Sequence, residues 1–112
     1  MAHTVFICTT CAALDGDPKG AALIADVSAR LAPLGDFEVR GQECLNVCDK
    51  PTAVAFRSEG KAAYLFAGVD AEADGPDVEA FAKLYADAPD GWIEDARPAG
   101  KLRFCLIGRI PA

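Results

Sequence analysis

The apolar residues of this chain recur with two different periods, and each period predicts a type of element. Runs of β-branched and aromatic residues, such as "HTVFIC" near the start, are typical of buried strands. Alternating apolar residues, such as Phe37 and Val39, indicate a strand with one buried face. A turn at Gly60 separates two further apolar runs, which favours a hairpin. The predicted strands are residues 3–8, 36–42, 52–57 and 61–67.

Apolar residues spaced three or four positions apart predict two helices. In the first, Leu23, Val27 and Leu31 share one face. Asp17 directly before Pro18 is a strong helix start, because it combines an N-cap residue with proline at the first helical position. The stripe of the second helix consists of Val78, Phe81, Leu84 and Tyr85. The predicted helices run from about Pro18 to Ala32 and from Gly75 to the residue before Pro89.

The elements follow the order β-α-β-β-β-α, with a tail over about residues 92–112. A helix between the first two strands predicts a parallel pair joined by a crossover, and the later strands predict a hairpin. This layout indicates one domain over residues 1–112, an α/β sandwich that is thioredoxin-like in outline, with a short C-terminal extension. Residues 102–110 of the tail are apolar enough for a strand or a packed extension.

The charge balance excludes some classes of partner. The chain has 17 acidic and 11 basic residues and a net charge of −6, whereas a nucleic-acid binder needs a basic surface. The start, "MAHTVFIC", has no basic segment and only a short apolar run, so we expect neither a signal peptide nor a membrane span. We therefore expect a cytoplasmic protein, in which close cysteine pairs favour metal binding or catalysis over structural disulfides.

Four of the five cysteines form two close pairs, and each pair follows a predicted strand. Cys8 and Cys11 stand in "CTTC", and Cys44 and Cys48 stand in "CLNVC". The carboxyl ends of adjacent parallel strands lie side by side, so we expect the two loops to come together at one end of the sheet. Four thiolates can hold either zinc or an iron–sulfur cluster. A bound iron–sulfur cluster also needs N–H donors, which the loops after these strands are expected to offer.

A dithiol oxidoreductase is an alternative, because C-x₂-C near a β-α unit is its usual sign. Pro51, just before a strand, stands where thioredoxin-like proteins keep a cis-proline. However, the predicted helix begins about seven residues after Cys11, so the pair lacks the helix N-terminus that lowers a thiol pKa. This alternative also leaves Cys44 and Cys48 without a role. A zinc-binding structural or delivery module would use the same four ligands and stays open.

Three other residues are expected to have structural roles. We interpret His3, the only histidine, as a solvent-exposed terminal residue. We interpret Cys105, inside "RFCLIG", as a small buried hydrophobic residue. Trp92 in "DGWIED" is expected to anchor the tail on the core.

The motif "CLNVC" resembles the second ligand pair of the thioredoxin-like 2Fe-2S ferredoxins, whose first pair is spaced more widely than "CTTC". Over nearly all 112 residues the chain is also similar to a small bacterial family of predicted metal-binding proteins. That similarity lies in "CTTC", "CLNVCDKP", "AYLF", "PDGW" and "GRIP".

The resemblance implies a 2Fe-2S cluster, with zinc as the alternative, held by four ligands: Cys8, Cys11, Cys44 and Cys48. The resemblance further implies an electron carrier rather than an enzyme. It also makes a homodimer one expected form of the protein. The acidic balance of the chain would suit a redox partner protein with a basic docking surface.

Overall fold

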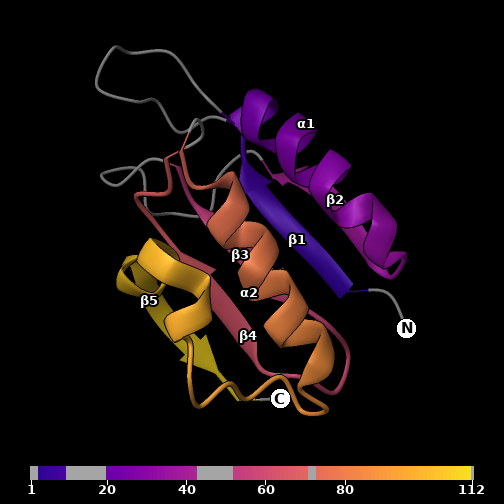
Figure 1. The fold of residues 1–112 in the computed structure, drawn as a ribbon, viewed down its shortest axis with the longest axis vertical. Helices are drawn as coiled ribbons and strands as arrows, with labels where there is room; N and C mark the ends of the chain where they lie inside the picture. Colours follow the sequence, from indigo (N-terminus) through magenta and orange to yellow (C-terminus); the bar gives the residue numbers. More distant parts are fainter. Residues whose placement is uncertain (1–2, 10–19, 43–51, 71–72, 112) are drawn as a thin grey trace.

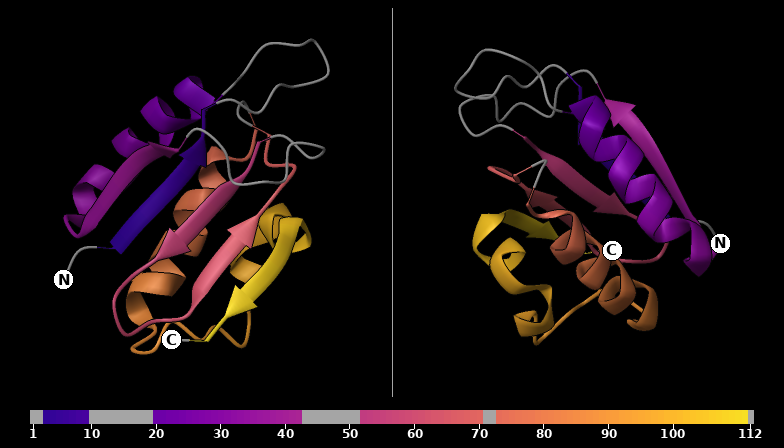
Figure 2. Two further views of the ribbon diagram at one scale, coloured as in Figure 1. Left: turned by 180° about the vertical axis from the view of Figure 1, so that it is seen from behind. Right: turned by 45° about the horizontal axis from the view of Figure 1, so that its top comes forward.

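The computed structural model describes residues 3–9, 20–42, 52–70 and 73–111, and it contains one five-stranded sheet. Helices α1 and α2 lie in front of the sheet in Figure 1, and the reverse view in Figure 2 shows the strands in front of them. In chain order the elements are β1 (His3–Cys8), α1 (Gly20–Leu31), the 3₁₀-helix η1 (Ala32–Leu34), β2 (Phe37–Gln42), β3 (Val54–Arg57), β4 (Ala63–Phe66), α2 (Gly75–Asp87), the 3₁₀-helix η2 (Arg97–Cys105) and β5 (Leu106–Ile110). All the predicted strands and helices are present, and the tail adds a fifth strand.

The strand order is β2-β1-β3-β4-β5. Strands β1 and β2 are parallel, as predicted from the helix between them, and β3, β4 and β5 each pair antiparallel with the preceding strand in this order. The parallel register sets Cys8 opposite Gln42, so β1 and β2 end at the same level. Strand β1 is an interior strand of the sheet, between the edge strand β2 and β3.

The core lies between the sheet and the two helices. Along β1, Val5 and Ile7 are fully buried while Thr4 and Phe6 are partly exposed, so the alternation of burial assigns one face of the strand to the helices. Aromatic rings fill the centre of this layer: Phe56, Tyr64, Phe66, Phe81 and Tyr85. Many of these rings meet edge to face, which is a favourable arrangement for buried aromatic pairs.

The tail is more regular than the sequence pattern indicates. Ala99 and Leu102 of η2 are buried in the core, and β5 then pairs with β4 at the edge of the sheet. The predicted anchor Trp92 remains 40% exposed. The hydroxyl of Tyr64 holds this segment instead, because it donates to the Gly91 carbonyl at 2.6 Å and accepts from the Ile93 N–H at 2.9 Å. The prediction that Trp92 anchors the tail was therefore wrong, because Tyr64 has this role.

The prediction of a solvent-exposed His3 was wrong. Its side chain is buried, because β1 begins at His3 and the ring stacks on Phe37 of the neighbouring strand. Nδ1 of His3 lies 3.0 Å from the Asp36 carbonyl oxygen, and Nε2 lies 2.8 Å from Nζ of Lys61. Both ring nitrogens thus have protein partners at the end of β1 opposite to Cys8.

The buried hydroxyl of Tyr85 leads us to expect that the protein loses stability at alkaline pH. The side chain is fully buried and its hydroxyl donates to the Ala62 carbonyl at 2.7 Å. Burial raises the pKa of Tyr85 to about 12 from its ordinary value of 10.0. The folded state therefore holds this proton more tightly than the unfolded state, and the stabilisation is complete below pH 10 and is lost as the pH rises towards 12.

The check is chemical denaturation between pH 9 and pH 11.5 for the wild type and for Tyr85→Phe. We expect Tyr85→Phe to be about 1 kcal/mol less stable at pH 8, because a buried hydrogen bond is lost. Between pH 10 and pH 11.5 the free energy of unfolding should fall in both proteins. We expect the fall to be smaller in Tyr85→Phe than in the wild type, by roughly 2 kcal/mol. Lys61 and the other titrating groups are present in both proteins, so equal slopes would contradict the role given to Tyr85.

Candidate functional site

Cys8 is the one proposed ligand that lies within the described residues. It is the last residue of β1 and is fully buried. The other three, Cys11, Cys44 and Cys48, lie outside the described residues, as does Pro51. The structure therefore defines the strand ends that flank these cysteines, and it does not test the ligand set itself.

The ends of three strands meet at Cys8. Its N–H donates to the Ala53 carbonyl at 3.0 Å, just before β3, and the N–H of Thr9 donates to the carbonyl of Gln42 at 2.8 Å. Cys11 follows Thr9 by two residues, Cys44 follows Gln42 by two, and Cys48 precedes Ala53 by five. The described residues that flank the two cysteine-bearing segments thus lie at one end of the sheet, and the predicted parallel pairing of β1 and β2 is confirmed. The predicted approach of the two loops lies outside the described residues.

Two glycines allow close packing around this end of the sheet. A Cβ on Gly20, the first residue of α1, would overlap the carbonyl oxygen of Cys8. A Cβ on Gly41 of β2 would lie 2.7 Å from Cγ2 of Thr9. The sequence analysis missed both residues. Their signal is a glycine inside an otherwise regular apolar pattern, which marks a close approach of another chain segment.

The hydrogen-bond donors at the end of β1 differ from what the sequence predicts. The N–H groups of Cys8 and Thr9 are already bonded to sheet carbonyls, so they are not donors for a sulfur ligand. Thr9 is the only described residue of the loop after β1, and the expectation of an available N–H donor fails there. In contrast, the contact of Gly20 with Cys8 sets the positive end of the α1 dipole beside the end of β1, which favours a negative charge there.

Cys105 lies at the same end of the sheet as Cys8, because β3, β4 and β5 alternate in direction, but it is displaced towards the opposite edge. It directly precedes β5, which is three strand spacings from β1, or roughly 14 Å. Its Sγ lies 3.8 Å from the Gly68 carbonyl oxygen, and it is partly buried against the core, close to what was predicted. Burial is also the main reason that the pKa of the Cys105 thiol is raised, so this thiol is poorly suited to be a reactive thiolate.

Within the described ranges, no three histidine, cysteine or acidic side chains gather into a metal-binding group. No helix in this part of the chain is both long and apolar enough to span a membrane. Four cysteines on segments that leave one end of a sheet can supply a four-sulfur site, which suits zinc or an iron–sulfur cluster.

Two solved structures share this fold. Both are described as a thioredoxin-like [2Fe-2S] ferredoxin from Aquifex aeolicus, and both are 13% identical to this chain. One match has a TM-score of 0.60 and covers 96% of this chain and 92% of the other. The second has a TM-score of 0.57 and covers 96% and 97%. The predicted thioredoxin-like α/β fold is confirmed by these matches.

A comparison with curated proteins found no match. A comparison with protein families found one whose pattern extends over nearly the whole chain, from residue 5 to residue 112. The chain therefore belongs to the family described as "Protein of unknown function (DUF1636)".

Proposed function

We propose that this protein is a ferredoxin-like electron carrier that binds one 2Fe-2S cluster through Cys8, Cys11, Cys44 and Cys48. The observation that supports it most is the meeting of β1, β2 and β3 at Cys8, because both cysteine pairs lie on segments attached there. A four-cysteine set is the usual ligand set of a 2Fe-2S cluster. The solved structures with this fold are ferredoxins by their descriptions, which supports the same class of function.

The described residues fit such a group. Cys8 is fully buried, and hydrogen bonds on both sides hold its backbone in the sheet, so a ligand at this position would be rigidly oriented. Gly20 and Gly41 leave room for tight packing of α1 and β2 around the end of β1. A bound 2Fe-2S cluster would supply one-electron chemistry, and the chain would orient it and limit its contact with water.

The proposed partner is a redox protein in a reducing compartment such as the cytoplasm. The net charge of −6 favours a basic docking surface on that partner. Charge steering speeds the encounter, and the small interfaces of electron-transfer complexes keep it weak. Both suit a protein that must bind and release its partner for each electron. A homodimer is compatible with this role.

The test is the absorption spectrum of anaerobically purified protein, with iron, sulfide and zinc measured on the same sample. Visible bands that bleach with dithionite, together with two iron and two sulfide per chain, are the result expected of a 2Fe-2S protein. A colourless protein with one zinc would overturn the proposal in favour of a structural or delivery module. A metal-free protein with reactive thiols, after attempted reconstitution of the iron–sulfur cluster, would favour a dithiol oxidoreductase.

A further inference from the structure

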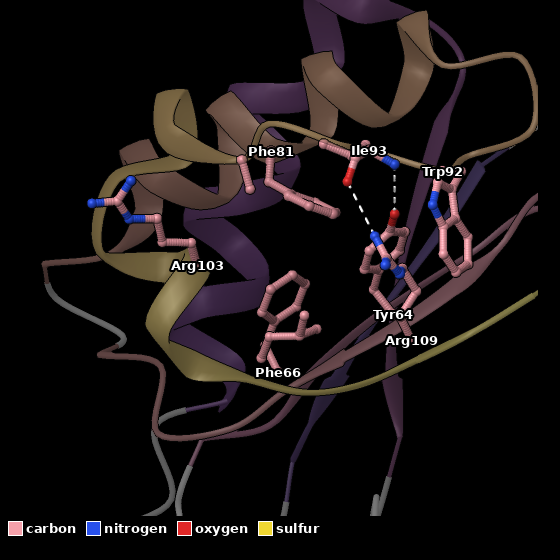
Figure 3. Close-up of a pocket in the computed structure, with 9 residues that line it drawn as sticks. Tyr64, Phe66, Phe81, Trp92, Ile93, Arg103 and Arg109 are labelled. Atoms are coloured by element: carbon pink, nitrogen blue, oxygen red, sulfur yellow. Dashed lines mark hydrogen bonds between the residues drawn. The ribbon is translucent and has the colours of Figure 1, made fainter.

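A cavity of about 390 Å³ lies between the tail and the helix-facing side of β4 and β5. Figure 3 shows its walls, which include the rings of Tyr64, Phe66 and Phe81. These three side chains are 4%, 1% and 2% exposed, so the cavity reaches into the aromatic core. Cavities that bind small molecules have a similar size and similar walls, typically about 300 to 1,000 Å³ and mostly apolar.

The cavity has one cationic group that is held in position. Nη1 of Arg109 donates to the Ile93 carbonyl at 3.1 Å, and its guanidinium lies 3.5 Å over the ring of Trp92. Figure 3 shows Arg109 beside Ile93 and Tyr64, whereas the guanidinium of Arg103 points away from the cavity. Arg103 instead lies over the ring of Phe104, at 4.6 Å.

Arg109 also lacks a carboxylate partner among the residues that the structure describes. Arg97 of the same tail shows the contrast, because its guanidinium lies 2.9 Å from the carboxylate of Asp95. A guanidinium has five N–H donors, and the Ile93 carbonyl occupies one of them. Arg109 therefore retains donors that can bind a carboxylate in a two-point arrangement.

The charge of the tail favours an anion at this place. The tail, residues 92–112, contains four basic and two acidic residues, although the whole chain has a net charge of −6. The basic residues of the tail are Arg97, Lys101, Arg103 and Arg109. Arg97 and Lys101 are paired with Asp95 and Asp74, so Arg103 and Arg109 carry the positive charge at the cavity. Such a local charge favours small anions there.

We propose that this cavity binds a small apolar or aromatic carboxylate. Its apolar part occupies the space between Tyr64, Phe66 and Phe81, and its carboxylate binds Arg109. Trp92 lies at the exposed edge of the cavity, 40% exposed, and limits access to it. This site lies at β4, β5 and the tail, so it is separate from the strand ends that carry the cysteines and does not depend on a bound iron–sulfur cluster.

The experiment titrates the purified full chain with 3-phenylpropionate and with its neutral amide, 3-phenylpropionamide. Isothermal titration calorimetry measures affinity, and the emission of Trp92, the only tryptophan, reports binding at this site. The variant is Arg109→Gln. Its control is Arg97→Gln, which removes the same charge from an arginine that does not line the cavity.

We expect 3-phenylpropionate to bind and to change Trp92 emission. The neutral amide and the Arg109→Gln protein should each show an affinity at least about tenfold weaker, because a charge-assisted hydrogen bond is lost. Arg97→Gln should stay within about twofold of the wild type. Equal affinity for the acid and the amide, equal loss in the two arginine variants, or no binding at millimolar probe concentrations would each overturn the proposal. The wild-type comparison of the two probes remains decisive if Arg109→Gln folds poorly.

Discussion

Replacing any one of Cys8, Cys11, Cys44 or Cys48 by serine is expected to remove the 2Fe-2S cluster, whereas Cys105→Ser is expected to retain it. A hydroxyl is a poor ligand for iron in a site built for thiolates, and a cluster with three thiolates is no longer held on all sides. We expect iron and sulfide to fall to roughly a tenth of the wild-type content or less, since the loss of even an outer partner of a ligand costs about 10- to 100-fold in affinity.

The loss of the iron–sulfur cluster should also lower the stability of the fold. A group that binds the folded chain and not the unfolded chain stabilises the folded state by mass action, and that contribution disappears with the ligand. The measurement is therefore twofold: iron and sulfide per chain, and the denaturation midpoint of each variant. Wild-type protein stripped of iron anaerobically gives the reference for the effect of the metal alone.

Cys105→Ser is the matched control in this series, because it removes a thiol of the same chain. Cys105 lies beyond two intervening strands from Cys8, and its sulfur has backbone carbonyls as neighbours. The variant should keep full iron content and its visible spectrum. A bleached Cys105→Ser protein would show that the assigned ligand set is wrong, and full iron content in Cys44→Ser would do the same.

The sequence predicts the elements of this fold well where a periodic pattern meets a clear stop signal. The run "HTVFIC" becomes β1 from His3 to Cys8, and the stripe of Leu23, Val27 and Leu31 becomes the buried face of α1. The position of Cys8 at a strand end, next to the end of β2, follows from the same reasoning, because a crossover helix requires parallel neighbours.

The errors come from contacts between residues far apart in the chain. His3 was expected to be exposed because it is near the first residue, but its burial depends on Phe37 and Lys61, which come from other elements. The cavity beside Arg109 combines residues of β4, α2 and the tail, and no local pattern marks it. The pairing of β5 with β4 likewise depends on how Ala99 and Leu102 pack, and local periodicity does not report this.

Gly20→Ala is expected to destabilise the protein, although alanine is the better helix former. On intrinsic propensity alone, glycine to alanine stabilises a helix interior by up to about 1 kcal/mol, and Gly20, at the first position of α1, would gain a fraction of this. However, the added Cβ would overlap the carbonyl oxygen of Cys8 and lie 2.9 Å from its carbonyl carbon, and these are backbone atoms that cannot rotate away. Separating α1 from the end of β1 would disturb packing, so we expect a net loss of about 2 kcal/mol.

The control for this prediction is Ser28→Ala, an exposed position in the same helix, where propensity acts without a new contact. It should gain a few tenths of a kcal/mol, so the two alanine substitutions should have opposite signs in chemical denaturation at equal metal content. Because Gly20 contacts Cys8 and Ser28 is two turns further along α1, only Gly20→Ala should also reduce the iron bound per chain. If the Gly20→Ala protein were as stable as the Ser28→Ala protein, α1 would not be in close contact with the end of β1. The argument that this contact fixes Cys8 as a rigid ligand would then lose its basis.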